Sequence, residues 1–157
     1  MERIVKRIAA VLALALFVYG QLSAAEYIDK LKEKYRADSR FQVVEMGNTM
    51  LKVAALGADR QTREVIRKIK SMSVIATADT PAGTLLHADA ESIPANGGEF
   101  LGEETEDGKT VKIYVFFEGE TVTDFTILLK GEYGIVMVTL VGSFTKEDFE
   151  KLEEIGK

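Results

Sequence analysis

The 157-residue chain contains no cysteine and only one histidine, and both shortages narrow the chemistry open to it. Without cysteine there is no disulfide and no thiol nucleophile, and most structural zinc sites are excluded. The lone histidine, His87, leaves no partner for a site built from several histidines. Because no Gly-x-Ser-x-Gly elbow accompanies it, we expect His87 to be a partly exposed helix residue rather than a catalytic base. The sequence therefore predicts no catalytic residue, no metal site and no cofactor.

A hydrophobic run long enough to cross a membrane is also missing at the start of the chain. After three basic residues, an apolar run covers residues 8–19, a stretch of 12. As a helix it would reach about 18 Å, whereas the hydrocarbon core of a bilayer is roughly 30 Å thick. Ser23 and Ala25 then fit the two small positions of a signal-peptidase site before Glu26. We therefore predict a cleaved signal peptide at residues 1–25, with an uncut anchor as the alternative, and export to the periplasm or cell surface.

Basic residues are fewer than acidic ones, 20 against 25, which gives the chain a net charge of −5. Removing residues 1–25 takes away three basic residues and one acidic residue, and leaves 132 residues with a net charge of −7. This length suits one domain with a core of its own. From the net charge we expect neither nucleic acid nor an anionic lipid surface as a partner, and we expect the membrane to be met only through the transient signal segment.

Helical and strand patterns alternate in the first half of the remaining chain. Asp79, Thr80 and Pro81 mark one helix start, because Asp or Thr can cap a helix and proline fits its first turn. The predicted helices are residues 26–36, 49–57, 62–70 and 80–91, and the predicted strands are residues 41–46 and 73–77.

The second half is typical of a meander of four strands. Asp107-Gly108, Glu118-Gly119 and residues 130–134 separate the apolar runs, and their glycines supply the positive φ that tight hairpins need. The predicted strands are residues 100–106, 109–117, 121–129 and 135–144.

A last helix is predicted after the meander. Thr145 and Asp148 have the spacing of a capping box, and Phe149, Leu152 and Ile155 would form the buried stripe of the helix. Helices early and strands late indicate an α+β fold rather than a wound parallel sheet. We therefore predict one α+β domain at residues 26–157, with a single mainly antiparallel sheet covered by about five short helices.

Both faces of the predicted meander are apolar, although a solvated face would carry polar residues at alternate positions. One face holds Val111, Ile113, Val115 and Phe117. The other holds Tyr114, Phe116 and Leu128. Either helices of the same chain cover this other face, or it binds a ligand or partner. In that case Tyr114, Phe116 and Leu128 are the candidate site.

Two polar segments suggest other chemistry. NGGEF at residues 96–100 is similar to the GGDEF or GGEEF signature of enzymes that cyclise GTP, but it lacks one metal-binding acid and is expected outside the cytoplasm, so we predict a glycine turn. An acidic cluster could in principle bind calcium, but strand alternation divides it between two faces, and we predict a solvated hairpin tip. The cluster consists of Glu103, Glu104, Glu106 and Asp107.

The order IRKIKSMSVIAT, then VKIYVFFEGETVTDFTILLKGEYGIVMVTLVGSFTKEDFEKL, resembles the domain of unknown function 4252. Members of this family are exported, often lipid-anchored proteins of Bacteroidetes-type bacteria, and the likeness covers roughly residues 26–155. The chain lacks the cysteine that carries the lipid in anchored members. The resemblance implies an envelope or secreted protein and assigns no activity.

These observations favour an exported, non-enzymatic binding protein whose ligand is an envelope protein, a peptide or a lipid. One alternative is a hydrolase that acts on envelope material through acidic residues, which needs a cleft with two carboxylates, one of them desolvated. Another is a structural module that self-associates as a homo-oligomer and so hides the sheet face that carries Tyr114 and Phe116.

Overall fold

The computed structural model describes residues 24–145, 147 and 148. Most of the predicted signal peptide, Ser23 included, lies outside these residues, as do Phe149, Leu152 and Ile155 of the predicted last helix. Ala25 and Glu26, which flank the predicted cleavage site, fall in the first turn of the first described helix. Within the described part of the chain, no helix is both long and apolar enough to span a bilayer.

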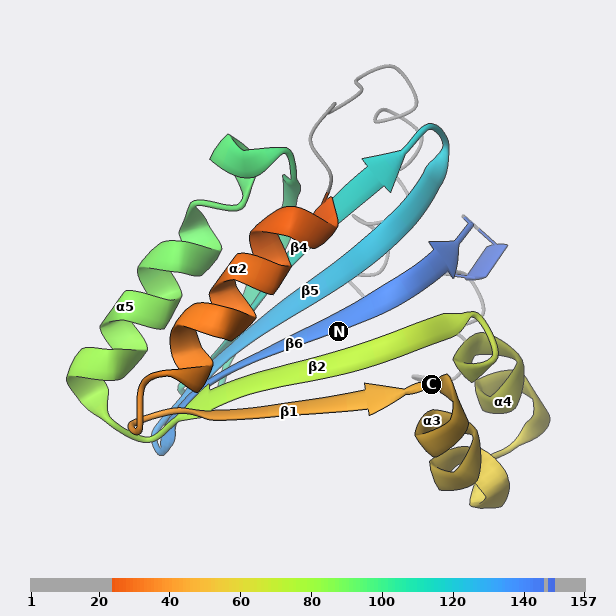
Figure 1. Ribbon diagram of the computed structural model, residues 1–157, viewed down its shortest axis with the longest axis horizontal. Helices are drawn as coiled ribbons and strands as arrows, with labels where there is room; N and C mark the ends of the chain where they lie inside the picture. Colours follow the sequence, from red (N-terminus) through yellow and green to blue (C-terminus); the bar gives the residue numbers. More distant parts are fainter. Residues whose placement is uncertain (1–23, 146, 149–157) are drawn as a thin grey trace.

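Six antiparallel strands form one sheet in the order β1-β2-β6-β5-β4-β3 (Figure 1). The predicted α+β class, the antiparallel sheet and the meander are therefore confirmed. The strands are β1 (Gln42–Gly47), β2 (Ile69–Thr77), β3 (Glu99–Glu106), β4 (Lys109–Glu118), β5 (Thr121–Gly131) and β6 (Gly134–Phe144). The helices are α2 (Ala24–Arg36), α3 (Asn48–Ala54), α4 (Arg60–Ile66) and α5 (Thr80–Glu91), with 3-10 turns η1 (Ala55–Gly57) and η2 (Pro94–Asn96).

The helix count and one boundary differ from the prediction. About five helices were expected, and the described residues contain four α-helices and two 3-10 turns. The helix expected at residues 62–70 ends at Ile66, and β2 already begins at Ile69. Ile69 pairs with Gly142 of β6 and is buried, so a contact distant in sequence overrides the local helical pattern.

Glycines set the ends of the meander strands as predicted. Asp107 and Gly108 have φ of 51° and 76° between β3 and β4, which matches the type of turn that continues the twist of a hairpin. Gly134 opens β6 with φ 142°, and a Cβ there would lie 2.2 Å from the backbone oxygen of Thr77. This position therefore accepts glycine alone.

Helices α2 and α5 lie side by side over one face of the sheet, which we call the helix face (Figure 1). Asp79 caps α5 by accepting a hydrogen bond from the Ala82 backbone N–H at 2.8 Å, as predicted from the sequence. Asp89 of α5 joins the two helices: the Tyr27 hydroxyl donates to its backbone oxygen at 2.6 Å, and Lys34 Nζ donates to its Oδ2 at 2.7 Å. The core of the domain lies between these helices and the sheet.

The opposite face of the sheet is also apolar, and we call it the second face. Its cluster includes Ile113, Val115 and Phe125, each no more than 8% exposed. Helices α3 and α4 add Leu51 and Ile66 to this cluster at one end of the sheet.

One of the two side-chain bonds of the predicted capping box after β6 is formed. The Thr145 backbone N–H donates to Asp148 Oδ2 at 2.7 Å, and the Asp148 backbone N–H donates to the Thr145 carbonyl at 3.1 Å. Asp148 is 1% exposed and forms an ion pair with Lys68. Burial raises the pKa of Asp148, but the bonds to Lys68 and Thr145 outweigh it, and the pKa lies below its usual range.

Candidate functional site

The residues proposed from the sequence as a ligand face lie inside the core. Tyr114, Phe116 and Leu128 are 2%, 1% and 1% exposed and pack beneath α2 and α5. Strand alternation puts all three on the helix face, and burial is the main cause that raises the pKa of Tyr114 to about 12. The helices of the same chain therefore cover this face, which was the alternative explanation, and none of the three side chains offers open surface to a partner.

The acidic hairpin is divided between two faces, as strand alternation requires. Glu103 lies opposite Lys112 and Glu104 opposite Val111 in the β3–β4 ladder, so consecutive carboxylates point to opposite sides of the sheet. Across residues 24–145, 147 and 148, no group of three or more acidic or histidine side chains is placed to hold a metal ion.

His87 takes part in a network that joins α5 to β4. Lys112 Nζ lies 3.3 Å from His87 Nε2 and donates to Glu91 Oε1 at 2.9 Å. The hydrogen bond from Lys112, followed by the charge of His87, holds the pKa of Glu91 below its usual range. The arrangement explains the half-buried histidine as a packing contact between the helix and the sheet.

Asp124 is a buried carboxyl group that the sequence prediction missed. It is 3% exposed on the helix face, and its Oδ2 has no hydrogen-bond partner among the described residues. Burial raises its pKa, the hydrogen bond from Thr123 lowers it, and Asp29 of α2 raises it further. A single aspartate at an inward position of an apolar strand was the available signal. Asp124 meets one requirement of the hydrolase alternative, a desolvated carboxyl, but it does not line the hollow at the end of the sheet.

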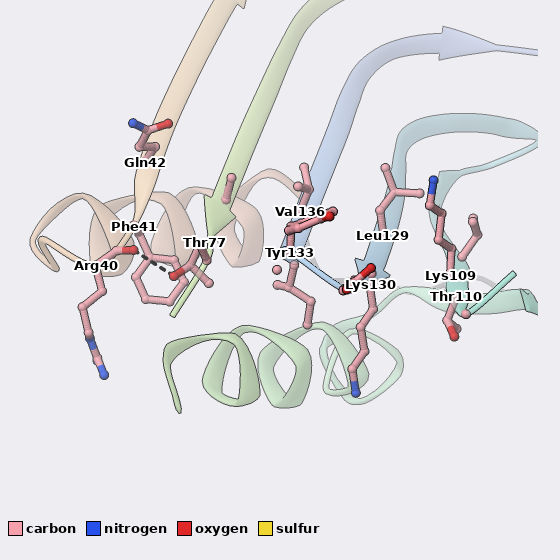
Figure 2. A pocket seen from close by; sticks show the side chains of 18 of the residues that line it. Arg40, Phe41, Gln42, Thr77, Lys109, Thr110, Leu129, Lys130, Tyr133 and Val136 are labelled. Carbon is pink, nitrogen blue, oxygen red and sulfur yellow. Dashed lines mark hydrogen bonds between the residues drawn. The ribbon is translucent and has the colours of Figure 1, made fainter. Parts of the chain in front are cut away.

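A hollow of about 1280 Å³ surrounds the end of the sheet where the β3–β4 and β5–β6 turns meet the start of β1 (Figure 2). Figure 2 shows Arg40 and Lys130 extending on the helix side of the strands and Leu129 on the other side. Between them, the Thr77 hydroxyl donates to the Arg40 carbonyl at 2.8 Å. The hollow is therefore lined by side chains from both sides of the sheet end.

The connection between β1 and β2, together with the first two residues of β2, forms a helical lobe, defined here as residues 48–70. It lies beyond the end of these strands, away from α2 and α5 (Figure 1). The Asn48 side chain donates to the Ile69 carbonyl at 2.8 Å, and Asp59 caps α4 by accepting from the Thr62 N–H at 2.8 Å. Leu51 and Ala55 of the lobe are buried. These contacts fix the lobe to the sheet through one side of α3 and η1.

The outward side of α3 and η1 is apolar and exposed. Met50, Val53 and Leu56 recur every third residue and are 60%, 63% and 75% exposed. Because Leu51 and Ala55 occupy the inward side, these three side chains share the opposite side of the helix. We call Met50, Val53 and Leu56 the apolar tip.

The lobe is basic within an acidic chain. It carries six basic residues and two acidic ones, a net charge of +4, so the rest of the chain carries −9. Arg60 pairs with Glu64 at 3.5 Å, and Lys68 pairs with Asp148. The other four form no ion pair with another described residue, although the charge of Arg63 contributes to lowering the pKa of Asp59. These four are Lys52, Arg63, Arg67 and Lys70.

Sequence reasoning missed the lobe as a site for two reasons. The segment TMLKVAAL is apolar almost all round, so periodicity alone did not separate the buried Leu51 from the exposed Met50. In addition, a charge summed over the whole chain conceals a local excess of the opposite sign. A charge count over residues 48–70 was the signal that would have found it.

Comparison with known proteins gives a family and no activity. No curated protein sequence matches the chain. A crystal structure of PA94, a protein of unknown function from Pseudomonas aeruginosa, is similar at a TM-score of 0.35 with 9% sequence identity, over 76% of this chain and 78% of that one. The family model described as domain of unknown function, DUF4252, matches residues 35–152, which is most of the chain. The chain therefore belongs to the DUF4252 family.

Proposed function

We propose that the protein is an exported, non-enzymatic binding protein that holds its partner through the apolar tip of the helical lobe. The observation that carries this proposal is the exposure of Met50, Val53 and Leu56 on one side of a short helix. Contiguous apolar side chains on a protein surface mark binding sites more often than isolated ones do.

The lobe is suited to binding because its position is fixed while its outer side is free. Leu51, which is 7% exposed, and the partly buried Ile66 anchor it to the second face of the sheet. The apolar tip contributes nothing to that anchoring. Its three side chains are therefore available to a partner without any rearrangement of the domain.

The basic amino-terminal segment and the apolar run of residues 8–19 support export. We propose the periplasm or the cell surface as the compartment in which the lobe meets its partner. Membership of DUF4252 fits this location and leaves the activity open.

The hydrolase alternative has less support in the described residues. It requires a desolvated carboxyl in a cleft beside a second carboxylate. Asp124 is desolvated, but it lies beneath α2 with its Oδ2 unpaired and does not border the hollow at the sheet end. A non-enzymatic role is therefore the better proposal.

The test compares partner capture by three forms of the purified protein, using an envelope fraction that contains both membranes and soluble proteins. One variant replaces the apolar tip, Met50→Ser, Val53→Ser and Leu56→Ser. The matched control replaces exposed apolar residues elsewhere, Leu85→Ser and Tyr133→Ser, which are 46% and 87% exposed. We expect the tip variant to lose capture and the control to keep it. Equal capture by all three forms would contradict the proposal.

Self-association is the remaining alternative. The mass of the protein in solution distinguishes it from binding to a different partner. Sedimentation equilibrium over a range of concentrations should give the monomer mass for the wild type and for the tip variant. A dimer that the tip variant abolishes would mean that the lobe binds a second copy of this chain.

A further inference from the structure

We infer that the partner of the helical lobe is the surface of an anionic lipid bilayer. This inference rests on the proposed function, because it names the partner of the same apolar tip. It goes beyond that proposal in specifying a lipid surface rather than a protein or peptide.

Charge complementarity supports this partner. The lobe has a net charge of +4, while the rest of the chain has −9. An anionic surface would attract the lobe and repel the remainder, so the protein would approach with the lobe foremost. The net charge of the whole chain sums these two regions and hides the positive lobe. This is why the net charge alone led us to expect no anionic lipid partner.

The lobe also combines apolar and basic groups as interfacial segments do. Segments that lie in the membrane interface insert large aliphatic side chains and keep Lys and Arg at the level of the headgroups. The apolar tip supplies the aliphatic groups, and Lys52 lies beside Val53 in α3. Arg63 and Arg67 are exposed and four residues apart, which places them on one side of the α4 segment.

The small area of the tip favours a bilayer over a protein partner. Stable protein–protein interfaces bury about 800 Å² on each partner, formed by roughly 20–30 residues. The outward side of α3 and η1 offers three large apolar side chains on a segment of ten residues. Insertion into a headgroup region needs no such extended complementary surface.

The position of the lobe allows this contact. It extends past the end of β1 and β2, while α2 and α5 lie over the helix face (Figure 1). The cations at the hollow, Lys109 and Lys130, lie at the opposite end of the strands, since that hollow is lined by the start of β1 and the end of β2. They therefore provide a matched control for charge.

The experiment is co-sedimentation of the full-length purified protein with lipid vesicles. One set contains phosphatidylcholine with about 30% phosphatidylglycerol, and the other contains phosphatidylcholine alone. We expect the wild-type protein to pellet with the anionic vesicles. With the neutral vesicles it should remain largely in the supernatant. Added salt should weaken binding, because the attraction is screened beyond a Debye length.

Two variants and a control separate the contributions. Each Lys or Arg near an anionic surface strengthens binding roughly fivefold, so Arg63→Gln with Arg67→Gln should weaken it more than tenfold. The tip variant with three serines should bind the anionic vesicles more weakly than the wild type does. The control, Lys109→Gln with Lys130→Gln, removes the same charge from the other end of the sheet and should bind as the wild type does.

Each of the following results would overturn the inference. Equal binding to neutral and anionic vesicles would remove the role of charge, and equal loss in the charge variant and its control would remove the role of the lobe. Binding to a DNA duplex as strong as that to the anionic vesicles would show a general polyanion site. If the protein does not bind vesicles but still captures an envelope protein through the apolar tip, the bilayer inference is wrong and the proposed function stands. If both fail, neither survives.

Discussion

Truncating Phe116 to alanine removes an aromatic ring from the centre of the helix-face core. Phe116 is 1% exposed, and its ring is closely packed: a Cβ added at Gly98 would lie only 3.2 Å from it. A phenylalanine buries roughly 200 Å², which at about 25 cal/mol/Å² corresponds to about 5 kcal/mol. Since alanine keeps one carbon of the side chain, we expect a loss of about 4 kcal/mol in the free energy of unfolding.

Phe100 supplies the matched control because it is the same residue type on the same face of the sheet. It is 46% exposed, and its ring centroid lies 5.4 Å from that of Tyr114. With about half its area buried, Phe100→Ala should cost about 2 kcal/mol. The ratio of the two costs follows from burial alone and does not depend on the exact coefficient.

Urea unfolding followed by circular dichroism measures both changes. With a slope of about 2 kcal/mol per molar, the midpoint should fall by roughly 2 M for Phe116→Ala and by roughly 1 M for Phe100→Ala. Equal shifts, or a cost below about 1 kcal/mol at Phe116, would mean that α2 and α5 do not cover this face. In that case the original assignment of Phe116 to an open ligand face would regain its basis.

Two further predictions concern a buried charge and a glycine. Asp124→Asn should leave stability little changed at low pH and raise it above wild type at neutral pH. Because burial raises the folded pKa of Asp124, the stability that this group allows is present below its unfolded pKa of about 3.9 and is lost as the pH rises through the folded value. Parallel stability curves from pH 3 to 7 for the two proteins, a range of about four units around these pKa values, would contradict this assignment. Gly134→Ala should cost more than about 2 kcal/mol in thermal or urea unfolding, because its Cβ would lie 2.2 Å from the Thr77 oxygen at φ 142°, whereas Gly57→Ala, with nothing within 4 Å, should change stability by less than about 1 kcal/mol.

Local signals in the sequence predicted the parts of the fold that depend on neighbouring residues. Asp107-Gly108 specified the β3–β4 turn, Asp79 capped α5, and the Asp148 side chain accepts a hydrogen bond from the Thr145 backbone N–H. Each of these features is decided within about four residues. The β2 boundary was wrong because Ile69 is held by Gly142, more than 70 positions away in the chain.

The candidate site was harder to predict because burial depends on the whole fold. Alternation correctly separated Tyr114 and Phe116 from Val115, but it gave no sign of which face the helices cover. The same limit applies in α3, where the buried Leu51 follows the exposed Met50 and both are apolar. Only the packing of the lobe against the second face distinguishes them.

The pairing of β2 with β6 bears on the order in which the molecule can be assembled during synthesis. The meander β3–β6 joins strands that follow one another, so it can close by short hairpins as it emerges. The β1–β2 ribbon is synthesised first. It cannot join the rest of the sheet until β6 exists, because β2 pairs with β6. A nascent chain that ends before Gly134 would thus hold β1 and β2 without the strand they pair with, and completion of β6 would bring this ribbon into register in a single late event.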